Sequence, residues 1–292
     1  MSRIEKVGVC GAAGTLGSGI AIVSARAGFE TLAYDLSPEI LDRARSDTER
    51  FFENSVARQK MEPADRDAAL TRLVPTTKLE ALADCDLVIE AVFEDLDVKQ
   101  ALFRSLDSIC AEEALLASNT STLSITEIAS AVEHPQRVVG MHFCLPAQVM
   151  KLIELSAGMN TSRAAFEAAW AWTQAAGQTP VETRDRPGFI LNAFVVPFNN
   201  DAIRLVEAGV AEPADIDRAL KVGLGYRRGP LELLDMIGLD TQLRLCEAFY
   251  PATLDPRAAA PPLLRRMVAA GHLGQKSGRG FYVHEGGRIY GS

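Results

Sequence analysis

Short apolar runs alternate with longer amphipathic stretches over the first part of the chain. A run of roughly four to eight apolar residues between turn residues is typical of a buried strand, and apolar positions three or four apart are typical of a helix. We therefore expect strands at residues 6–10, 29–34, 86–91, 114–117, 137–142, 151–156 and 179–183. Helices are expected between them, at residues 15–27, 36–60, 95–109 and 162–176, with a short one after residue 124.

Capping residues support several of these boundaries. Gly28 follows the first helix, Ser37 and Pro38 suit the N-cap and first position of the second, and Ser124 with Glu127 forms a capping-box pattern. Strands separated by helices form parallel sheets with helices on both faces. The pattern predicts a doubly wound α/β sheet domain.

The pattern changes after residue 186. Five helices are predicted at residues 189–208, 213–222, 230–237, 239–249 and 263–270, and no strand longer than three or four residues is evident before Phe281. We therefore expect a sheet domain at residues 1–186 and an all-helical domain at residues 187–292.

Composition excludes several classes of protein. The chain of 292 residues has 30 Lys and Arg against 38 Asp and Glu, a net charge of −8, which does not favour nucleic-acid binding. No apolar stretch reaches the ~18 residues of a membrane helix. Five cysteines without a C-x-x-C pair indicate reduced thiols, so we expect a cytoplasmic protein with no metal site and no signal peptide.

A glycine-rich turn follows the first predicted strand, and Asp35 ends the second. Glycines allow backbone N–H groups to approach a pyrophosphate at a helix N-terminus, and an acid at the second strand's end binds the ribose hydroxyls, favouring NAD over NADP. The spacing is G-x-x-G-x-x-G, one residue longer than the standard fingerprint, and an ordinary turn that binds nothing is the alternative. The predicted contacts are Gly11, Gly14, Thr15, Leu16, Gly17 and Asp35.

His142 differs from the other histidines because it ends an apolar strand, where a doubly wound sheet binds its ligands. Glu154 lies within the next apolar strand, and a buried acid must be paired or protonated. If the turn between them brings these strands together, the carboxylate would orient the imidazole as a base. The alternative is a structural histidine beside an acid that backbone N–H groups satisfy.

Several longer motifs resemble the L-3-hydroxyacyl-CoA dehydrogenase family, including its bacterial 3-hydroxybutyryl-CoA type. The resemblance covers nearly the whole chain and includes a Rossmann-type first domain. It rests on residues 14–21, 88–94 (VIEAVFE), 118–121 (SNTS), 140–143 (GMHF), 149–154, 185–192 (DRPGFILN), 229–233 and 278–282.

The resemblance implies reversible, NAD-dependent oxidation of an L-3-hydroxyacyl-CoA to the 3-oxoacyl-CoA, a reaction of fatty acid metabolism. It implies that His142 is the catalytic base paired with Glu154, and that Ser121 and Asn192 contact the substrate. It also implies a homodimer formed by the helical domain, and CoA binding near the cations of residues 43–60. The implied cofactor contacts after the third strand and in the SNTS motif are Ala91, Glu94, Lys99 and Ser121.

Two departures from the family pattern bear on cofactor and substrate. Leu145 stands where the family has an asparagine near the nicotinamide, and Arg227 and Arg228 stand where it has smaller or apolar residues. A dehydrogenase of a free hydroxy acid, of the gulonate or carnitine type, is one alternative. A non-catalytic NAD-binding protein is the other. A dehydrogenase assay on acyl-CoA thioesters and their free acids separates the three.

Overall fold

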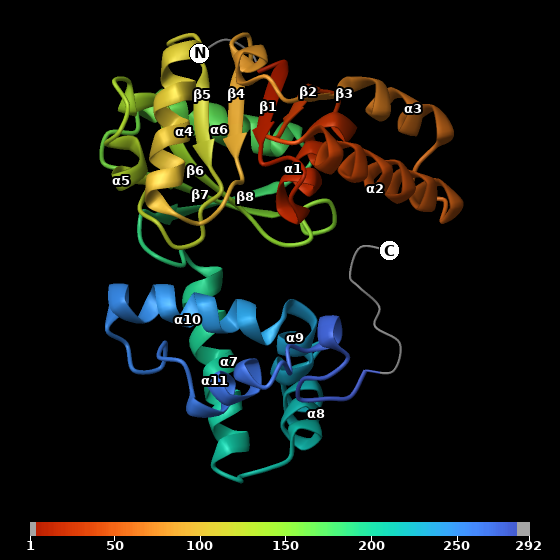
Figure 1. Cartoon of the computed structure of the whole chain (residues 1–292), viewed down its shortest axis with the longest axis vertical. Coiled ribbons are helices and arrows are strands. Elements are labelled where there is room, and N and C mark those ends of the chain that lie inside the picture. Colours follow the sequence, from red (N-terminus) through yellow and green to blue (C-terminus); the bar gives the residue numbers. More distant parts are fainter. Residues whose placement is uncertain (1–3, 285–292) are drawn as a thin grey trace. The chain divides into compact units, whose positions relative to one another are not determined.

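An eight-stranded sheet forms the centre of the first unit in the computed structural model, which describes residues 4–284 and divides after Phe189 (Figure 1). The order is β3-β2-β1-β4-β5-β6-β7-β8, with β7 and β8 antiparallel to the rest. The predicted doubly wound α/β fold is confirmed. The strands are β1 (Lys6–Cys10), β2 (Glu30–Tyr34), β3 (Leu73–Thr76), β4 (Leu87–Glu90), β5 (Leu115–Ser118), β6 (Val138–Phe143), β7 (Leu152–Ala157) and β8 (Thr179–Arg184).

Alternate residues of the central strands supply the two faces of the sheet. Val7, Val9 and Ile89 join the core under α1 (Thr15–Arg26) and α6 (Arg163–Ala175). Val88 and Leu116 face the opposite core, beneath α4 (Leu96–Ile109) and α5 (Ile125–Ala129). Burial on both faces explains why these strands have continuous apolar sequences.

The strand order reverses between β1 and β4, since β2 lies on the other side of β1. At such a switch point, the connections leave in opposite directions and open a crevice at the carboxyl ends of the strands. Gly11 directly follows β1 and Ala91 directly follows β4. The glycine turn therefore lies at the edge of the sheet where this fold class binds its ligands.

The sequence interpretation missed β3 and α3 (Pro63–Arg72). It placed the N-cap of α2 (Pro38–Ala57) correctly at Ser37, but the expected side-chain capping hydrogen bond is not formed. Strand β3 is a four-residue edge strand containing Pro75, and only Ala69 of α3 is buried, so neither has an apolar pattern. Ser37 occupies the N-cap position, but its hydroxyl bonds to the Glu39 carboxylate instead of a backbone N–H. At α5 the predicted Ser124 cap accepts from the Glu127 N–H.

The second unit is helical, as the sequence predicted. Its core includes a buried amide cluster in which Gln242 donates to the Asn200 side chain and to the Val196 carbonyl. Its last described segment is held by Asp235, whose carboxylate accepts from the Phe281 and Tyr282 N–H groups. The helices are α7 (Leu191–Glu207), α8 (Pro213–Leu224), α9 (Pro230–Ile237), α10 (Leu239–Thr253) and α11 (Pro262–Ala269).

Within residues 4–284, no helix combines the length and apolar character needed to cross a bilayer. Over the same range, no group of three His, Cys, Asp or Glu side chains is arranged to hold a metal ion.

All five cysteines are buried free thiols. Burial raises the pKa of the Cys144 thiol, for example, to about 11, and the nearby Glu154 charge acts in the same direction. These thiols are therefore protonated at neutral pH.

Candidate active site

His142 and Glu154 lie directly opposite each other on the antiparallel strands β6 and β7. The His142 Nδ1 is 2.8 Å from Glu154 Oε2, and the residues are 5% and 1% exposed. The two strand ends thus bring the imidazole and the carboxylate together, as the sequence reasoning expected. A carboxylate only accepts, so Nδ1 carries the proton and Nε2 is the hydrogen-bond acceptor of the neutral ring.

Ser121 lies on the other side of the imidazole, in the loop after β5. Its hydroxyl oxygen is 3.0 Å from the His142 Nε2. A second contact joins the ends of β5 and β6, because the buried Asn119 side chain accepts from the Phe143 N–H at 2.8 Å. The loop that carries Ser121 is therefore fixed relative to the strand that carries His142.

Glu94 anchors the same loop from the β4 side. Its Oε1 accepts four hydrogen bonds, from the Thr120 and Thr122 hydroxyls and the Ser121 and Thr122 N–H groups, at 2.6–2.9 Å. Burial alone would raise the pKa of this carboxyl, but the Lys99 charge and these hydrogen bonds outweigh it and lower the pKa. Glu94 is consequently ionised at neutral pH and organises the backbone around Ser121.

Lys99 is 1% exposed and pairs with two carboxylates, Glu90 and Glu94. Glu90 is fully buried, and it also accepts from the Ser118 hydroxyl and the Val92 N–H. The ammonium group of Lys99 is thus enclosed by protein carboxylates. Sequence reasoning missed Glu90, although an acid in a four-residue buried strand was the same signal that identified Glu154.

The glycine turn is packed so closely that two of its glycines have no room for a side chain. A Cβ on Gly17 would overlap the Gly11 carbonyl oxygen, and a Cβ on Gly11, whose φ is +77°, would lie 2.6 Å from the Ala91 carbonyl oxygen. No side chain caps α1, whose N-cap residue is Gly14, so the first-turn N–H groups of Thr15 to Gly17 remain available. This start fits an anionic pyrophosphate.

Asp35 follows β2 and contacts the extra residue of the turn. Its Oδ2 accepts from the Ala13 N–H at 3.0 Å and its Oδ1 accepts from the Leu36 N–H at 2.8 Å. Each carboxylate oxygen has a second lone pair, so both remain able to accept from a ribose hydroxyl. The turn and Asp35 together fit the diphosphate and ribose of a dinucleotide.

Asn192 belongs to the helical unit, where it occupies the second position of α7. Ser121, His142 and Glu154 are brought together within the sheet unit, which also contains all the predicted cofactor residues. Leu145, in the loop after β6, is 58% exposed. Sequence reasoning also missed Phe189, whose ring centroid is 5.3 Å from that of His142.

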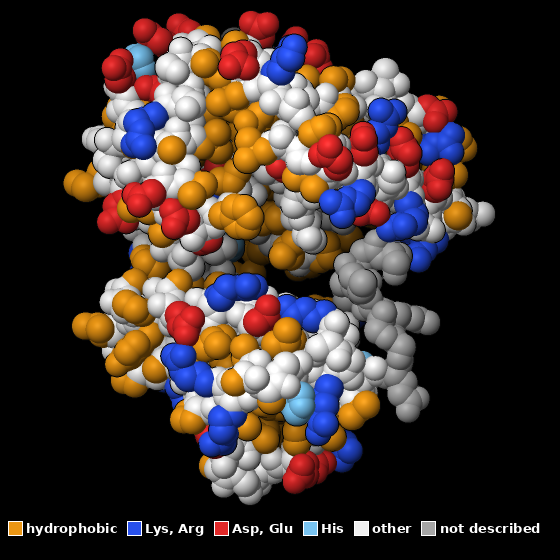
Figure 2. All heavy atoms as spheres, viewed as in Figure 1, with side chains coloured by type: hydrophobic (Ala, Val, Ile, Leu, Met, Phe, Trp, Pro, Cys, Tyr) orange, Lys and Arg blue, Asp and Glu red, His pale blue; other side chains and the backbone are white. Residues whose placement is uncertain are grey.

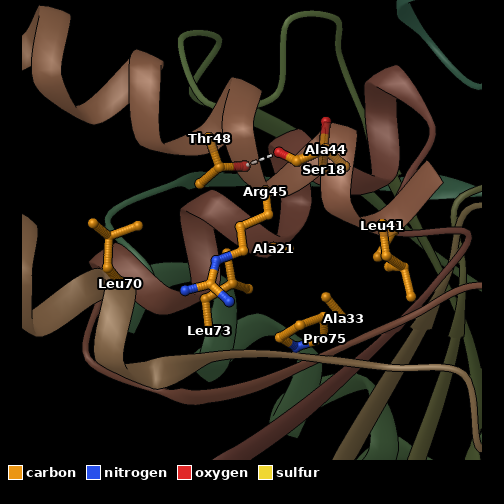
Figure 3. A pocket seen from close by; sticks show the side chains of 11 residues that line it. Ser18, Ala21, Ala33, Leu41, Ala44, Arg45, Thr48, Leu70, Leu73 and Pro75 are labelled. Carbon is orange, nitrogen blue, oxygen red and sulfur yellow. Dashed lines mark hydrogen bonds between the residues drawn. The ribbon is translucent and has the colours of Figure 1, made fainter. Parts of the chain in front are cut away.

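A pocket opens between α1, α2, α3 and the edge of the sheet (Figure 3). Leu41, Leu70 and Pro75 make its lining largely apolar, and the Thr48 hydroxyl donates to the Ala44 carbonyl of its own helix. Its charged residue, Arg45, is paired with Glu49 at 3.0 Å. This pocket contains no acid or base, in contrast to the cluster around His142.

The cluster of Ser121, His142 and Glu154 is able to perform general base chemistry. Nε2 of the neutral imidazole accepts a proton, and the Glu154 charge stabilises the imidazolium that forms. A hydroxyl beside Nε2 orients an incoming alcohol through a hydrogen bond. The edge of the sheet therefore combines a base with a turn that fits a dinucleotide.

Comparison with protein-family models gives two matches that together cover most of the chain. Residues 6–186 match the 3-hydroxyacyl-CoA dehydrogenase NAD binding domain. Residues 188–284 match the 3-hydroxyacyl-CoA dehydrogenase C-terminal domain.

Individual relatives give the same result. A 3-hydroxybutyryl-CoA dehydrogenase of Mycobacterium tuberculosis is 43% identical over 283 residues, 96% of this chain and 99% of the relative. The 3-hydroxyadipyl-CoA dehydrogenase of Escherichia coli is 41% identical over 97% of this chain and 59% of the relative. The crystal structure of M. tuberculosis FadB2 superposes with a TM-score of 0.95 at 43% identity, covering 97% of this chain and 100% of that one.

The anchoring of the Ser121 loop by Glu94 is testable by amide hydrogen exchange. In Glu94→Ala the Ser121 and Thr122 N–H groups lose a charged acceptor, worth roughly 1.5–3 kcal/mol per bond, so we expect their exchange to accelerate ~10–100-fold. Folding lowers the pKa of Glu94 below its ordinary value of 4.5. In the wild type, these N–H groups should therefore be protected at any pH above 4.5, and the protection should be lost only as the pH falls through the lowered pKa of the folded protein. Exchange is measured residue by residue by NMR.

The matched control is Glu113→Ala, which removes an exposed acid just before β5. It should leave exchange at Ser121 and Thr122 unchanged. Equal exchange rates in Glu94→Ala and the wild type would show that Glu94 does not hold this loop.

Proposed function

The chain belongs to the 3-hydroxyacyl-CoA dehydrogenase family, and we propose that His142 is the base with which it oxidises L-3-hydroxyacyl-CoA to 3-oxoacyl-CoA, reversibly. The protein is an NAD-dependent oxidoreductase. The main support for His142 as the base is its pair of short contacts, with Ser121 at Nε2 and with Glu154 at Nδ1.

In the proposed step His142 Nε2 takes the proton of the 3-hydroxyl group. The chemistry that NAD supplies when bound is acceptance of the hydride released from carbon 3. Glu154 keeps the proton of the neutral imidazole on Nδ1 and stabilises the imidazolium that forms. Such positioned proton transfer is worth roughly 10²–10⁴ in rate.

Ser121 and Asn192 orient the substrate in this proposal. The Ser121 hydroxyl, beside Nε2, is suited to bind the reacting oxygen of the substrate. Asn192, at the start of α7, has an amide that can hydrogen-bond the substrate from the helical unit. Alignment of reactants in this way lowers a barrier by up to ~7–11 kcal/mol, which is more than the proton transfer itself contributes.

The proposed cofactor contacts fall into three groups. The turn from Gly11 to Gly17 holds the pyrophosphate and Asp35, after β2, holds the adenosine ribose. Ala91, Glu94 and Ser121 follow β4 and β5, on the other side of β1, and contact the nicotinamide half of the cofactor. Lys99, buried against Glu90 and Glu94, acts in this proposal by fixing Glu94.

Cations on α2 are proposed to hold the phosphates of CoA. Lys and Arg side chains lie among Asp and Glu side chains over α2 and α3 (Figure 2). Arg45 and Arg50 form ion pairs with acids of the same helix, whereas Arg43 and Arg58 form no ion pair with any residue between 4 and 284. These two exposed guanidinium groups are free to bind a phosphate.

A homodimer formed by the helical unit is also proposed. This unit exposes large apolar side chains, among them Phe194, Val222 and Leu224, which are 76%, 81% and 62% exposed. Exposed apolar groups of this size favour burial against a partner. A second copy of the chain is the proposed partner.

The proposed base is tested with His142→Gln and Glu154→Gln. Gln cannot take a proton, so we expect His142→Gln to abolish turnover and Glu154→Gln to lower kcat by ~10²–10⁴. NADH formation is measured against 3-hydroxybutyryl-CoA, 3-hydroxyadipyl-CoA and the corresponding free acids, because relatives are named for both acyl groups. NAD affinity should stay close to that of the wild type in both variants.

His134→Gln is the control, since this loop histidine pairs with Asp107 away from the site and should not affect kcat. Near-normal turnover in His142→Gln would overturn the assignment of the base. Faster oxidation of a free acid than of its thioester would contradict the CoA substrate.

The role of Asp35 is tested by Asp35→Ser. Loss of the charged acceptor should raise the KM for NAD by roughly 10–100-fold and reduce the preference for NAD over NADP, because the repulsion of a 2′-phosphate is also removed. Steady-state kinetics with both cofactors measure the effect. Asp84→Ser, at an exposed acid before β4, makes the same charge change at the amino end of the strands and should leave both values unaltered.

The dimer is tested by the mass of the wild-type protein in solution. Sedimentation equilibrium over a wide range of protein concentrations should give twice the mass of one chain, with dissociation only on dilution. A monomer mass at every concentration would refute the dimer.

A further inference from the structure

Phe189 combines deep burial with a backbone conformation that aromatic residues rarely adopt. It is 4% exposed and its φ is +48°, in the left-handed region, where a Cβ crowds the backbone. Strain of this kind persists only where the surrounding structure holds it, and such residues are concentrated at functional sites.

Two other non-glycine residues with positive φ in the described chain, Gln59 and Leu254, have a common explanation. Both follow the ends of helices, α2 and α10, where a left-handed residue closes the last turn, and both are exposed. Phe189 ends no helix and is buried.

The turn from Arg186 to Phe189 is tied to the loop that carries Ser121. The Phe189 N–H donates to the Arg186 carbonyl, and the Gly188 N–H donates to the Ser121 carbonyl at 3.0 Å. Just before it, Asp185 accepts from the N–H groups of Ile125 and of the next residue. The turn is therefore fixed on one side by α5 and on the other by Ser121 itself.

The same turn places the Phe189 ring against the imidazole. The two ring centroids are 5.3 Å apart, with the planes tilted by 40°. Glu154 and Ser121 hold the two nitrogens of His142 within its ring plane, and the Phe189 ring supplies an apolar contact to that ring. The imidazole thus has a carboxylate, a hydroxyl and an aromatic ring around it.

We propose that Phe189 is a positioning residue, held in a strained turn anchored to Ser121 so that its ring fixes the plane of the His142 imidazole. The proposal rests on the proposed role of His142 as the base. Because one turn contacts the Ser121 carbonyl and supplies the ring packed on His142, it fixes the hydroxyl and the imidazole relative to each other. A small rotation of the ring would misdirect the Nε2 lone pair.

Phe189→Gly separates the ring from the turn, since glycine adopts a positive φ without strain and the hydrogen bonds of the turn remain possible. We expect kcat to fall by ~10–100-fold with the KM for NAD unchanged, because small misplacements of reacting groups cost rate of this order. The deuterium isotope effect on kcat, measured with substrate labelled at carbon 3, should rise as the chemical step becomes limiting. Phe189→Leu, which keeps an apolar side chain, should recover most of the loss.

The matched control is Phe166→Leu on α6, which alters a phenylalanine of similar burial, 6% exposed, in the core under the sheet. A purely structural effect lowers the fraction of folded enzyme, which reduces the rate but cannot change an isotope effect. The control should therefore leave the isotope effect at the wild-type value. An unchanged isotope effect in Phe189→Gly would overturn the proposal.

A second measurement is independent of turnover. Among the four histidines, the Nδ1–H of His142 bonded to Glu154 should give a downfield NMR signal in ¹⁵N-histidine-labelled protein, assigned by its loss in His142→Gln. We expect faster solvent exchange of this proton in Phe189→Gly and no change in Phe166→Leu. Unaltered exchange in Phe189→Gly would also count against the proposal.

The outcomes distinguish this inference from the proposed function. A wild-type protein inactive on every thioester contradicts the function, and the NMR exchange still decides the role of Phe189. The role of His142 as the base stands if the wild type is active and His142→Gln is inactive. If Phe189→Gly then behaves like Phe166→Leu, the positioning role of Phe189 is refuted.

Discussion

His142 and Glu154 face each other because β6 and β7 run antiparallel, whereas the strands from β3 to β6 are parallel. A direct antiparallel return brings two side chains near in sequence to opposite positions on one face of the sheet. A slip of one residue would turn the carboxylate to the other face and leave both polar groups buried without each other. Both are almost fully buried, so the energy that fixes this register also fixes the geometry of the proposed base.

A second set of charges, two of them buried, connects the switch point of the sheet to this pair. Lys99 lies between Glu90 at the end of β4 and Glu94, and Glu94 in turn holds the backbone of Ser121. Removing one member of a buried ion pair costs roughly 3–5 kcal/mol, because the remaining charge is left without compensation. The loop beside His142 therefore keeps its shape through Glu94, a partly exposed carboxylate that is held by Lys99, which is itself buried against Glu90.

The sequence predicted the elements that have a buried face and failed where burial is slight. Strand β3, at the sheet edge with Pro75, and the polar helix α3 give no apolar periodicity, so pattern reasoning had nothing to detect. Glu154 was found because an acid in an apolar strand needs a partner, and the same reasoning applied to Glu90 would have found the second network. Phe189 was beyond reach, since its φ and its contact with His142 depend on a turn closed by long-range hydrogen bonds.

The extra residue in the glycine turn shows how a departure in spacing is accommodated. Gly11 and Gly17 keep the close approach that the fold requires, and the Gly14 N–H donates to the Gly11 carbonyl. The additional length is taken up at Ala12 and Ala13, where the Ala13 N–H bonds to Asp35. The turn therefore keeps close glycine contacts at its longer spacing, and its extra length supplies a backbone donor to Asp35, the carboxylate proposed to bind the ribose. Spacing along the sequence matters less here than the close backbone contacts of Gly11 and Gly17, which leave no room for a side chain.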